Sequence, residues 1–212
     1  MLKEVQCCLL CGHELNSNVT WLFFSERFPD VICPRCEEKF ERIETSLLSK
    51  QLEAEEQPSR WNNNHIALYR YNEAMRDYLH RYKFMKDVVL AKVFRKDLNT
   101  VFRRLSGIVV PIPLHPVKLK ERTFSQVDEL LNEASVPYED VLEKLTTESQ
   151  STKNRAERLA TAQLFKTKDV VKPYEYIIFD DIYTTGTTIE HARRALLEAG
   201  AKSVKSVTLI RG

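Results

Sequence analysis

Tyr176-Ile-Ile-Phe-Asp-Asp-Ile-Tyr-Thr-Thr-Gly-Thr-Thr188 is the most informative stretch of this chain. Its first four residues, Tyr176 to Phe179, are apolar and aromatic or β-branched, which predicts a buried strand of an α/β sheet. Asp180 and Asp181 are expected at the C-terminal end of that strand. The residues after Tyr183 form a hydroxyl-rich loop with one glycine. They open onto a helix whose apolar side is formed by Ile189, Ala192, Leu196 and Ala199.

The same stretch has the chemistry of a phosphate-sugar site. A helix N-terminus presents unpaired backbone N–H groups and partial positive charge, so it favours anions. Glycine permits close backbone approach and threonine hydroxyls add donors. We therefore expect a phosphate to bind the loop made of Thr184, Thr185, Gly186, Thr187 and Thr188. Asp180 and Asp181 can accept hydrogen bonds from ribose hydroxyls and bind a hard cation such as Mg²⁺. Ordinary helix capping explains an Asp-Asp pair alone, but the whole string is more specific.

The composition is that of a globular protein with one medium-sized domain and a small appendage. The chain has 212 residues and a net charge of +2. Its apolar runs are shorter than the ~20 residues that a membrane span needs, and its N-terminus lacks a signal peptide's apolar core. We therefore expect a cytoplasmic protein.

Charge is distributed unevenly along the chain. Residues 1–60 carry 7 Lys and Arg against 11 Asp and Glu, whereas residues 61–212 carry 25 against 19. Within the second part, residues 70–122 hold 13 against 5. An acidic front and a basic middle indicate different partners for the two parts. Two solvated surfaces are the alternative interpretation.

All five cysteines lie in the first 36 residues. Four of them form two C-x₂-C pairs, Cys8 with Cys11 and Cys33 with Cys36, at a spacing close to that of Cys₄ zinc ribbons. Two disulfides are one alternative, which a cytoplasmic chain disfavours. Unrelated buried cysteines are the other, and the paired spacing argues against them. We therefore predict a structural Zn²⁺ held by four thiolates, with Cys7 left over.

The residues around the cysteine pairs support weaker predictions. Four aromatic residues lie between the pairs, and most are expected to pack around the metal: Trp21, Phe23, Phe24 and Phe28. A helix is predicted over residues 37–57, because apolar residues recur at near-helical spacing and Pro58 follows. The domain boundary is placed near residue 60. Residues 1–60 then form the zinc ribbon with its connecting helix, and residues 61–212 form the main domain.

The basic middle of the chain begins with a predicted strand from Ile66 to Tyr71. Two helices should follow. The first has an apolar stripe of Met75, Tyr78, Leu79 and Tyr82, and the second is supported by Val89, Ala91, Val93, Phe94 and Leu98. Seven cations stud both helices: Arg76, Arg81, Lys83, Lys86, Lys92, Arg95 and Lys96. Such a face is usually only solvated, and attraction of a nucleic-acid backbone is the less frequent use.

Gly107 to Pro113 is predicted to form the next buried strand, with a second phosphate-binding loop at its end. Three cations follow that strand: Lys118, Lys120 and Arg122. Arg122 can bind a diphosphate through two parallel hydrogen bonds, which a lysine cannot. A helix is expected from about Ser125 to Ala134. Leu142 to Phe165 has little strand character and is expected to be a mobile loop that leads into a helix. Ser203 to Ile210 alternates and is predicted to be the final strand.

These motifs, in this order, resemble the ComF family. Phe179-Asp-Asp-Ile-Tyr-Thr-Thr-Gly186 is similar to the phosphoribosyl-diphosphate (PRPP) motif of type I phosphoribosyltransferases. Three segments precede it: Val110-Pro-Ile-Pro-Leu-His115, Lys118-Leu-Lys-Glu-Arg-Thr-Phe-Ser-Gln126, and a stretch with Thr147, Gln150, Arg155 and Arg158. With the cysteine pairs, the resemblance covers nearly the whole chain. It implies an α/β fold, a type I phosphoribosyltransferase-like parallel sheet flanked by helices, with a small N-terminal Cys₄ zinc ribbon.

The resemblance also implies a function. Members of the family are competence factors of natural transformation that act beside ComFA, a helicase-like ATPase that helps draw single-stranded DNA inward. Such a protein is expected to reach the membrane only through its partners. Binding of single-stranded DNA, and of PRPP with Mg²⁺, is implied as well.

The resemblance assigns roles to particular residues. Asp180 and Asp181 become the catalytic candidates, Lys118, Lys120 and Arg122 the diphosphate ligands, and the loop 184–188 the site of the 5-phosphate. Thr123 stands where the family commonly has glycine. The alternative function is an active phosphoribosyltransferase that acts on a nucleobase or another acceptor. A nucleobase-salvage enzyme is less favoured, because the zinc ribbon is foreign to that class.

Overall fold

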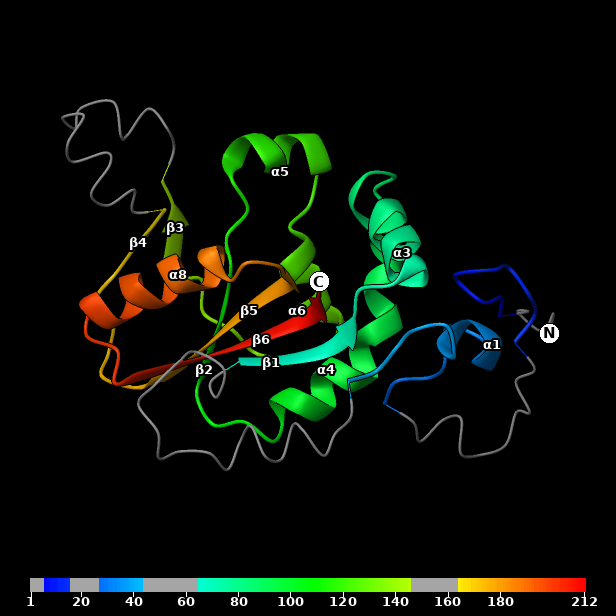
Figure 1. Ribbon diagram of the computed structural model, residues 1–212, viewed down its shortest axis with the longest axis horizontal. Coiled ribbons are helices and arrows are strands. Elements are labelled where there is room, and N and C mark those ends of the chain that lie inside the picture. Colours follow the sequence, from blue (N-terminus) through cyan, green and yellow to red (C-terminus); the bar gives the residue numbers. More distant parts are fainter. Residues whose placement is uncertain (1–5, 16–26, 44–64, 146–163) are drawn as a thin grey trace.

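The computed structural model describes residues 6–15, 27–43, 65–145 and 164–212. At its centre is a four-stranded parallel sheet (Figure 1). The order of its strands is β1 (His65–Arg70), β6 (Ser203–Arg211), β5 (Glu175–Tyr183) and β2 (Ile108–Pro111). β6, the last strand in the chain, therefore lies between β1 and β5. Most of its residues are buried, on both faces of the sheet.

Helices cover both faces of the sheet. The core on one face includes α8 (Thr187–Glu198), and the core on the other face includes α3 (Glu73–Lys83), η3 (Val88–Phe94), α4 (Arg95–Phe102) and α6 (Gln126–Glu133). Alternate residues of β5 point to opposite cores, with Tyr176 and Ile178 on the α8 side and Ile177 and Phe179 on the other. Burial on both faces explains why this strand is a continuous apolar run.

The predicted helices after β1 are largely confirmed. α3 begins after Asn72, whose side chain accepts a hydrogen bond from the N–H of Met75 at 3.0 Å. The whole predicted stripe of α3 is buried. The second predicted helix is divided into η3, a 3₁₀ helix, and α4. α6 begins after Ser125, whose hydroxyl accepts from the N–H of Asp128.

The prediction of a helix over residues 37–57 is wrong over its described part. α1 (Pro34–Glu37) ends where that helix was expected to begin. Residues 41–43 run beside β1 instead, because the N–H of Arg70 donates to the carbonyl of Glu41 and the N–H of Ile43 donates to that of Leu68, each at 2.9 Å. Pairing with a distant strand thus overrides local helical spacing. The remainder of that prediction lies outside the described residues.

The expectation of little strand character between Leu142 and Phe165 is wrong at both ends. β3 (Leu142–Lys144) and β4 (Phe165–Thr167) form a separate antiparallel pair. Leu142 and Phe165 are completely buried in the core beside α8. Each strand has only three residues, too few for a recognisable alternation. The predictions for residues 146–163, like those for Trp21, Phe23 and Phe24, lie outside the described residues.

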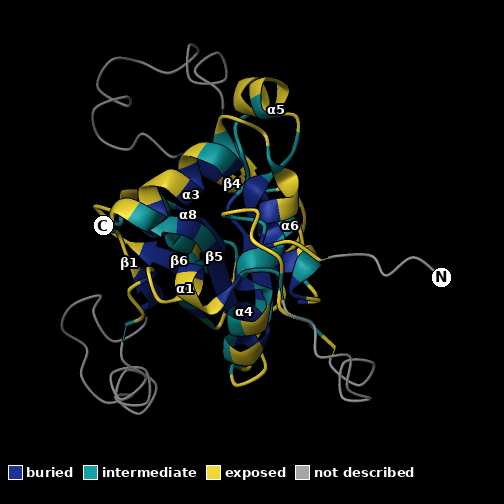
Figure 2. Ribbon diagram, turned by 90° about the vertical axis from the view of Figure 1, so that its right-hand side faces the viewer, coloured by how far each residue is buried: buried dark blue, intermediate teal, exposed yellow. Residues whose placement is uncertain are grey.

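α5 (Pro116–Arg122) differs from the other longer helices because none of its residues is buried. It stands away from the sheet, and its surface is mostly exposed (Figure 2). Among the described residues, no helix has the length and apolar character that a membrane crossing requires.

Candidate functional site

The sequence predicted Asp180 and Asp181 at the C-terminal end of a strand. That position is wrong, because both residues lie within β5. β5 continues to Tyr183, since Ile182 and Tyr183 still pair with β6. On the other side, β2 ends at Pro111. The chain that follows β2 lines a cavity beside the two carboxylates. The unequal lengths of neighbouring strands thus place both acids next to open space at the carboxyl edge of the sheet, where ligands of α/β proteins bind.

The cavity has a volume of about 150 Å³ and a strongly polar lining. Two acids and three cations contribute to it: Asp180, Asp181, Lys83, Arg122 and Lys144. Its remaining walls are formed by Ile112, Pro113, Leu114, Ser125, Gln126, Val127 and Thr188. These residues come from β5, α3, α5, α6, α8, β3 and the segments that follow β2 and α5. The cavity therefore collects chain segments that are far apart in the sequence.

The two neighbouring acids have different electrostatic surroundings. Asp181 is buried and forms an ion pair with Lys83, whose side chain is itself only 13% exposed. Asp180 accepts a hydrogen bond from the N–H of Asp181 at 2.8 Å. Burial and the Asp181 carboxylate raise the pKa of Asp180 to about 7, although that N–H and the cations of Lys83 and Lys144 act in the opposite direction. Asp180 is therefore a carboxyl group whose proton can be lost near neutral pH.

The second predicted phosphate-binding loop is a helix, and only one of its three cations reaches the cavity. Arg122, the last residue of α5, lines the cavity and donates to the side-chain oxygen of Gln126 at 2.8 Å. Lys118 forms an exposed ion pair with Glu121 at 3.2 Å, and Lys118 and Lys120 are not among the residues that line the cavity. Thr123 ends the helix with a φ of +71°, a left-handed backbone that favours glycine.

The threonine-rich loop lies at the N-terminus of α8, as predicted. Gly186 precedes that helix with a φ of +77°, and a Cβ there would lie 2.5 Å from the hydroxyl oxygen of Tyr183. The hydroxyl oxygens of Thr185 and Thr187 lie 2.9 Å apart on the exposed surface. Of the five predicted loop residues only Thr188 lines the cavity. Thr184, Thr185, Gly186 and Thr187 form the adjoining surface at the helix terminus, where an anion is favoured.

Two cavity residues, Lys83 and Lys144, are not predicted by the sequence motifs. The sequence places Lys83 among the solvated cations of its helix, but it is the last residue of α3 and forms an ion pair with Asp181 in β5. Lys144 belongs to the unpredicted strand β3. The predicted apolar stripe of α3, which includes Tyr82, does set the direction in which the helix faces the core. Lys83 directly follows Tyr82 of that stripe, so the stripe could have indicated that Lys83 lies close to the core. No sequence pattern indicates the position of Lys144.

The four predicted metal ligands come together. The sulfur atoms of Cys8, Cys11, Cys33 and Cys36 all lie within 4.8 Å of one another, and Cys7 is exposed outside this group. The Cys11 and Cys33 sulfurs are 3.8 Å apart, which is about the separation of two ligands at 2.3 Å from a tetrahedral zinc ion. The backbone N–H of Cys33 also donates to the sulfur of Cys8 at 3.3 Å. The donor set and its spacing therefore fit zinc.

The crowding of these four thiols opposes their joint ionisation. Burial opposes ionisation of Cys8, but backbone N–H donors, that of Cys33 foremost, lower its pKa to about 6. Burial and the crowded sulfurs raise the pKa of Cys36 to about 12. A divalent metal would supply the positive charge that lets all four ionise together.

The cysteine cluster is attached to the helices that carry the cavity. Arg81 donates to the carbonyls of Leu9 and Leu10 at 2.9 and 3.1 Å, two residues before Lys83 in α3. Leu9 and Leu10 lie within the first cysteine pair. The guanidinium of Arg81 also forms an ion pair with Asp87 at 2.8 Å. The cysteine cluster and the acidic pair are therefore linked through the last turn of α3.

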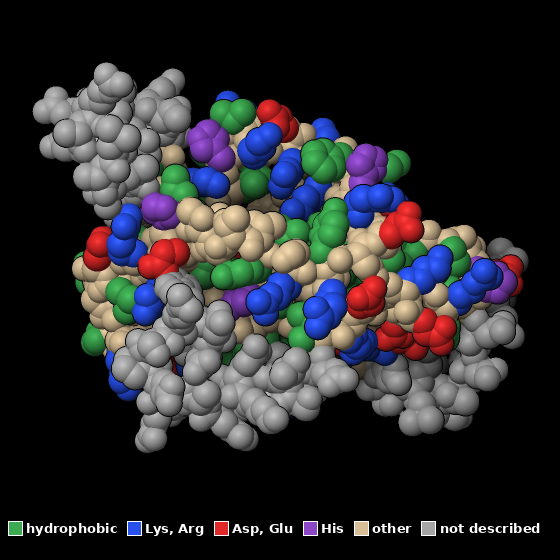
Figure 3. Space-filling view, in the orientation of Figure 1, with side chains coloured by type: hydrophobic (Ala, Val, Ile, Leu, Met, Phe, Trp, Pro, Cys, Tyr) green, Lys and Arg blue, Asp and Glu red, His purple; other side chains and the backbone are tan. Residues whose placement is uncertain are grey.

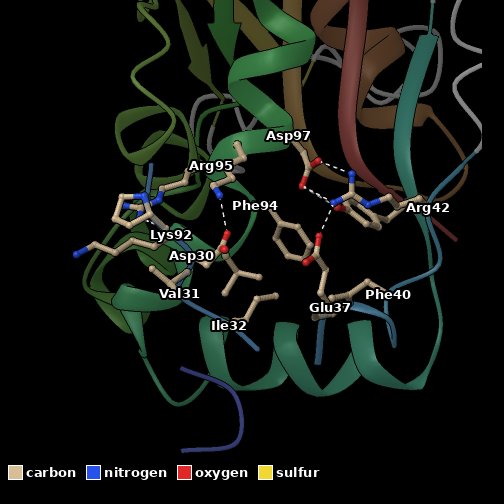
Figure 4. Close-up of a pocket in the computed structure, with 14 residues that line it drawn as sticks. Asp30, Val31, Ile32, Glu37, Phe40, Arg42, Lys92, Phe94, Arg95 and Asp97 are labelled. Carbon is tan, nitrogen blue, oxygen red and sulfur yellow. Dashed lines mark hydrogen bonds and ion pairs between the residues drawn. The ribbon is translucent and has the colours of Figure 1, made fainter. Parts of the chain in front are cut away.

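A small cavity marks a second contact between the cysteine-bearing segment and the main domain. Figure 4 shows Arg42 between Glu37 and Asp97, with which it forms ion pairs at 2.9 and 2.7 Å. Asp97 also accepts from the hydroxyl of Tyr69 at 2.8 Å. The cavity measures only about 50 Å³, and Phe40 packs into the adjoining core. Its small size and its paired charges indicate a packing contact between these two parts of the chain and not a ligand site.

Comparison with known proteins agrees with this geometry. The phosphoribosyl transferase domain family matches residues 119–212. The competence protein ComFC of Streptococcus pneumoniae is 38% identical over 221 residues, which cover 96% of this chain and 99% of that protein. ComFC of Bacillus subtilis is 32% identical over 226 residues, with coverage of 96% and 94%. A solved phosphoribosyltransferase from Corynebacterium diphtheriae is 13% identical with a TM-score of 0.40, over 64% of this chain and 87% of that chain. The domain match and the helix-flanked parallel sheet confirm the predicted phosphoribosyltransferase-like fold.

Proposed function

Because this chain belongs to the ComFC family of competence proteins, we propose that it is a competence factor with a binding site for PRPP and Mg²⁺. The main support is the cavity at the carboxyl edge of the sheet, where two acids and three cations meet. An anionic sugar diphosphate needs cations for its phosphates and acceptors for its hydroxyls, and this lining offers both. The cavity adjoins the helix N-terminus of the family motif.

Each charged group has a role in this proposal. Arg122, Lys83 and Lys144 face the diphosphate, where the planar guanidinium gives two parallel hydrogen bonds and the lysines give point charges. The loop 184–188 and the N-terminus of α8 take the 5-phosphate. Asp180 and Asp181 accept from the ribose hydroxyls and hold Mg²⁺. Bound Mg²⁺ would neutralise diphosphate charge.

We also propose that residues 1–60 form a unit with structural zinc at Cys8, Cys11, Cys33 and Cys36, joined through residues 40–43 to a main domain over residues 61–212. Four thiolates close the coordination shell, so such a zinc ion would have no open position for catalysis. Following the resemblance to the ComF family, this unit would recruit the ComFA ATPase in the cytoplasm while the main domain handles single-stranded DNA. The acidic composition of the first 60 residues suits a protein partner better than a nucleic acid.

Ligand-induced stabilisation tests the PRPP site. At a PRPP concentration of about 100 Kd, with Mg²⁺ present, the folded protein should gain about 2.7 kcal/mol, a rise in Tm of roughly 5–10 °C. Inorganic phosphate at equal concentration is the control and should give a smaller rise. An unchanged Tm with PRPP and Mg²⁺ would contradict the assignment.

A transformation assay tests the competence role. The gene is deleted in a transformable bacterium that carries this protein, and variants are supplied from a plasmid. Wild type and Cys7→Ser should restore the transformation frequency, whereas Cys33→Ser should not, because loss of a metal ligand removes the structure of the cysteine-bearing unit. Normal transformation in the deletion strain would rule out the competence role. Full rescue by Cys33→Ser would rule out a need for the zinc site.

A further inference from the structure

Phe84 is a large apolar side chain that the fold leaves in solvent. It follows Lys83 at the C-terminal end of α3, and 67% of its surface is exposed. Met85 beside it is 64% exposed. The core of the domain does not use either side chain, although aromatic residues elsewhere in the same helix are completely buried. Exposed apolar groups that lie together commonly mark a binding surface.

The ring of Phe84 lies beside the PRPP cavity. The guanidinium carbon of Arg122 is 5.9 Å from its centroid, and Arg122 itself lines the cavity with Lys83. The ring of His80 lies 5.8 Å away on the preceding turn of α3. A cation over an aromatic ring keeps both groups oriented. Phe84 and Arg122 therefore form a flat, partly cationic platform at one side of the cavity.

The surroundings of this platform are basic. Figure 3 shows Lys and Arg side chains gathered around the hollow beside α5. Lys86 follows Met85 in the sequence, and residues 70–122 carry 13 Lys and Arg against 5 Asp and Glu. A flat apolar ring with surrounding cations is complementary to a ligand that has flat rings and regularly spaced phosphates. That description fits unpaired nucleotides, because a duplex hides the faces of its bases.

We propose that Phe84 and Arg122 form a stacking platform for a base of single-stranded nucleic acid, which places a nucleotide beside the cavity. The base would stack on Phe84, and the flanking phosphates would lie near Arg122 and Lys86. The inference rests on the proposed PRPP site, since it makes the same cavity the place where the strand and the sugar diphosphate meet. It also names the face of the domain that the strand contacts.

Fluorescence anisotropy of a short fluorescein-labelled oligothymidylate, at one fixed salt concentration, tests the platform. Phe84→Ala should weaken binding by the full-length, zinc-loaded protein at least about fivefold, the loss expected for one stacked base. Phe84→Trp should retain or improve it. Tyr174→Ala is a matched control, because Tyr174 is 52% exposed with Lys172 6.0 Å from its ring centroid, at the opposite edge of the sheet. This control should bind as wild type does.

A second probe separates stacking from simple charge attraction. An oligonucleotide of the same length with abasic sites has the same phosphates but no rings, and wild type should bind it about as weakly as Phe84→Ala binds oligothymidylate. The proposal is overturned if Phe84→Ala binds oligothymidylate as wild type does. It is equally overturned if wild type binds the abasic strand just as tightly, or binds no strand. Unaltered strand binding together with lost capture of a protein partner would assign Phe84 to a protein interface instead.

The PRPP site is tested separately on the same proteins. Phe84→Ala should keep most of the rise in Tm that PRPP and Mg²⁺ cause, because Phe84 does not line the cavity and Arg122 is still held by its hydrogen bond to Gln126. Strand binding through Phe84 without any effect of PRPP would support the platform and refute the PRPP site. A rise in Tm with PRPP but no strand binding would refute the platform and leave the PRPP site standing.

Discussion

Replacing Asp180 by asparagine should make the ligand-free protein more stable. Burial and the neighbouring Asp181 raise the pKa of Asp180 from 3.8 to about 7. Between those pH values the folded protein holds a proton that the unfolded chain has lost, so its stability falls as pH rises and the full penalty is present above pH 7. A difference of about three pH units corresponds to about 4 kcal/mol. Asparagine cannot ionise and avoids this penalty.

The expected gain is smaller than that upper value. Asp180 is only partly buried, and its replacement also removes an attractive partner of Lys83 and Lys144. We therefore expect Asp180→Asn to raise the free energy of unfolding by about 2 kcal/mol at pH 8 and by almost nothing at pH 4, where the wild-type carboxyl is protonated in the folded state. Urea denaturation followed by circular dichroism measures both values.

The adjacent residue gives a matched control of opposite sign. Asp181→Asn leaves the ammonium of Lys83 without its carboxylate partner in a pair whose side chains are 13% and 9% exposed. Breaking such a pair should destabilise the protein by about 3 kcal/mol. The reasoning fails if Asp180→Asn is no more stable than wild type at pH 8. It also fails if the gain is as large at pH 4, since the cause would then not be ionisation.

Three further predictions concern other parts of the chain. Gly186→Ala should lower the free energy of unfolding, measured by urea denaturation, by about 1–3 kcal/mol. The substitution combines a φ of +77° with a Cβ 2.5 Å from the Tyr183 hydroxyl oxygen. Unchanged stability would contradict the left-handed backbone conformation at Gly186. Cys8→Ser should lose zinc in elemental analysis while Cys7→Ser keeps about one ion per chain, and equal loss would refute the ligand set. Burial lowers the pKa of His65 to about 4. The free energy of unfolding of wild type should therefore fall by up to about 3 kcal/mol relative to that of His65→Gln as pH falls from about 6.5 to 4. If the stability of both proteins had the same pH dependence, a buried neutral histidine would be contradicted.

Local patterns were sufficient for the sheet and the cysteine cluster. The apolar run from Tyr176 to Phe179 predicted a buried strand because both of its faces are covered. The two C-x₂-C pairs predicted a four-sulfur cluster because each pair sets its own turn. In both cases the information lies within a few neighbouring residues, where spacing alone determines which side chains can meet.

The charged lining of the cavity needed information that no short segment carries. Lys83 has the sequence environment of a solvated cation, and only the packing of α3 against β5 brings it to Asp181. Lys144 depends on a three-residue strand whose partner lies more than 20 positions further along the chain. The diphosphate-binding role of Lys118 and Lys120 stays a prediction, since α5 places Lys118 in an exposed ion pair and both lysines outside the cavity lining.

Calorimetric titration of the zinc-loaded protein with PRPP tests the central claim most directly. Wild type should bind one PRPP per chain with Mg²⁺ present and far more weakly after Mg²⁺ is removed. Asp180→Asn should lose most of this binding although it is expected to be the more stable protein, so that the loss cannot be attributed to unfolding. Equal binding by the variant, or no binding by folded wild type, would contradict a PRPP site at this cavity.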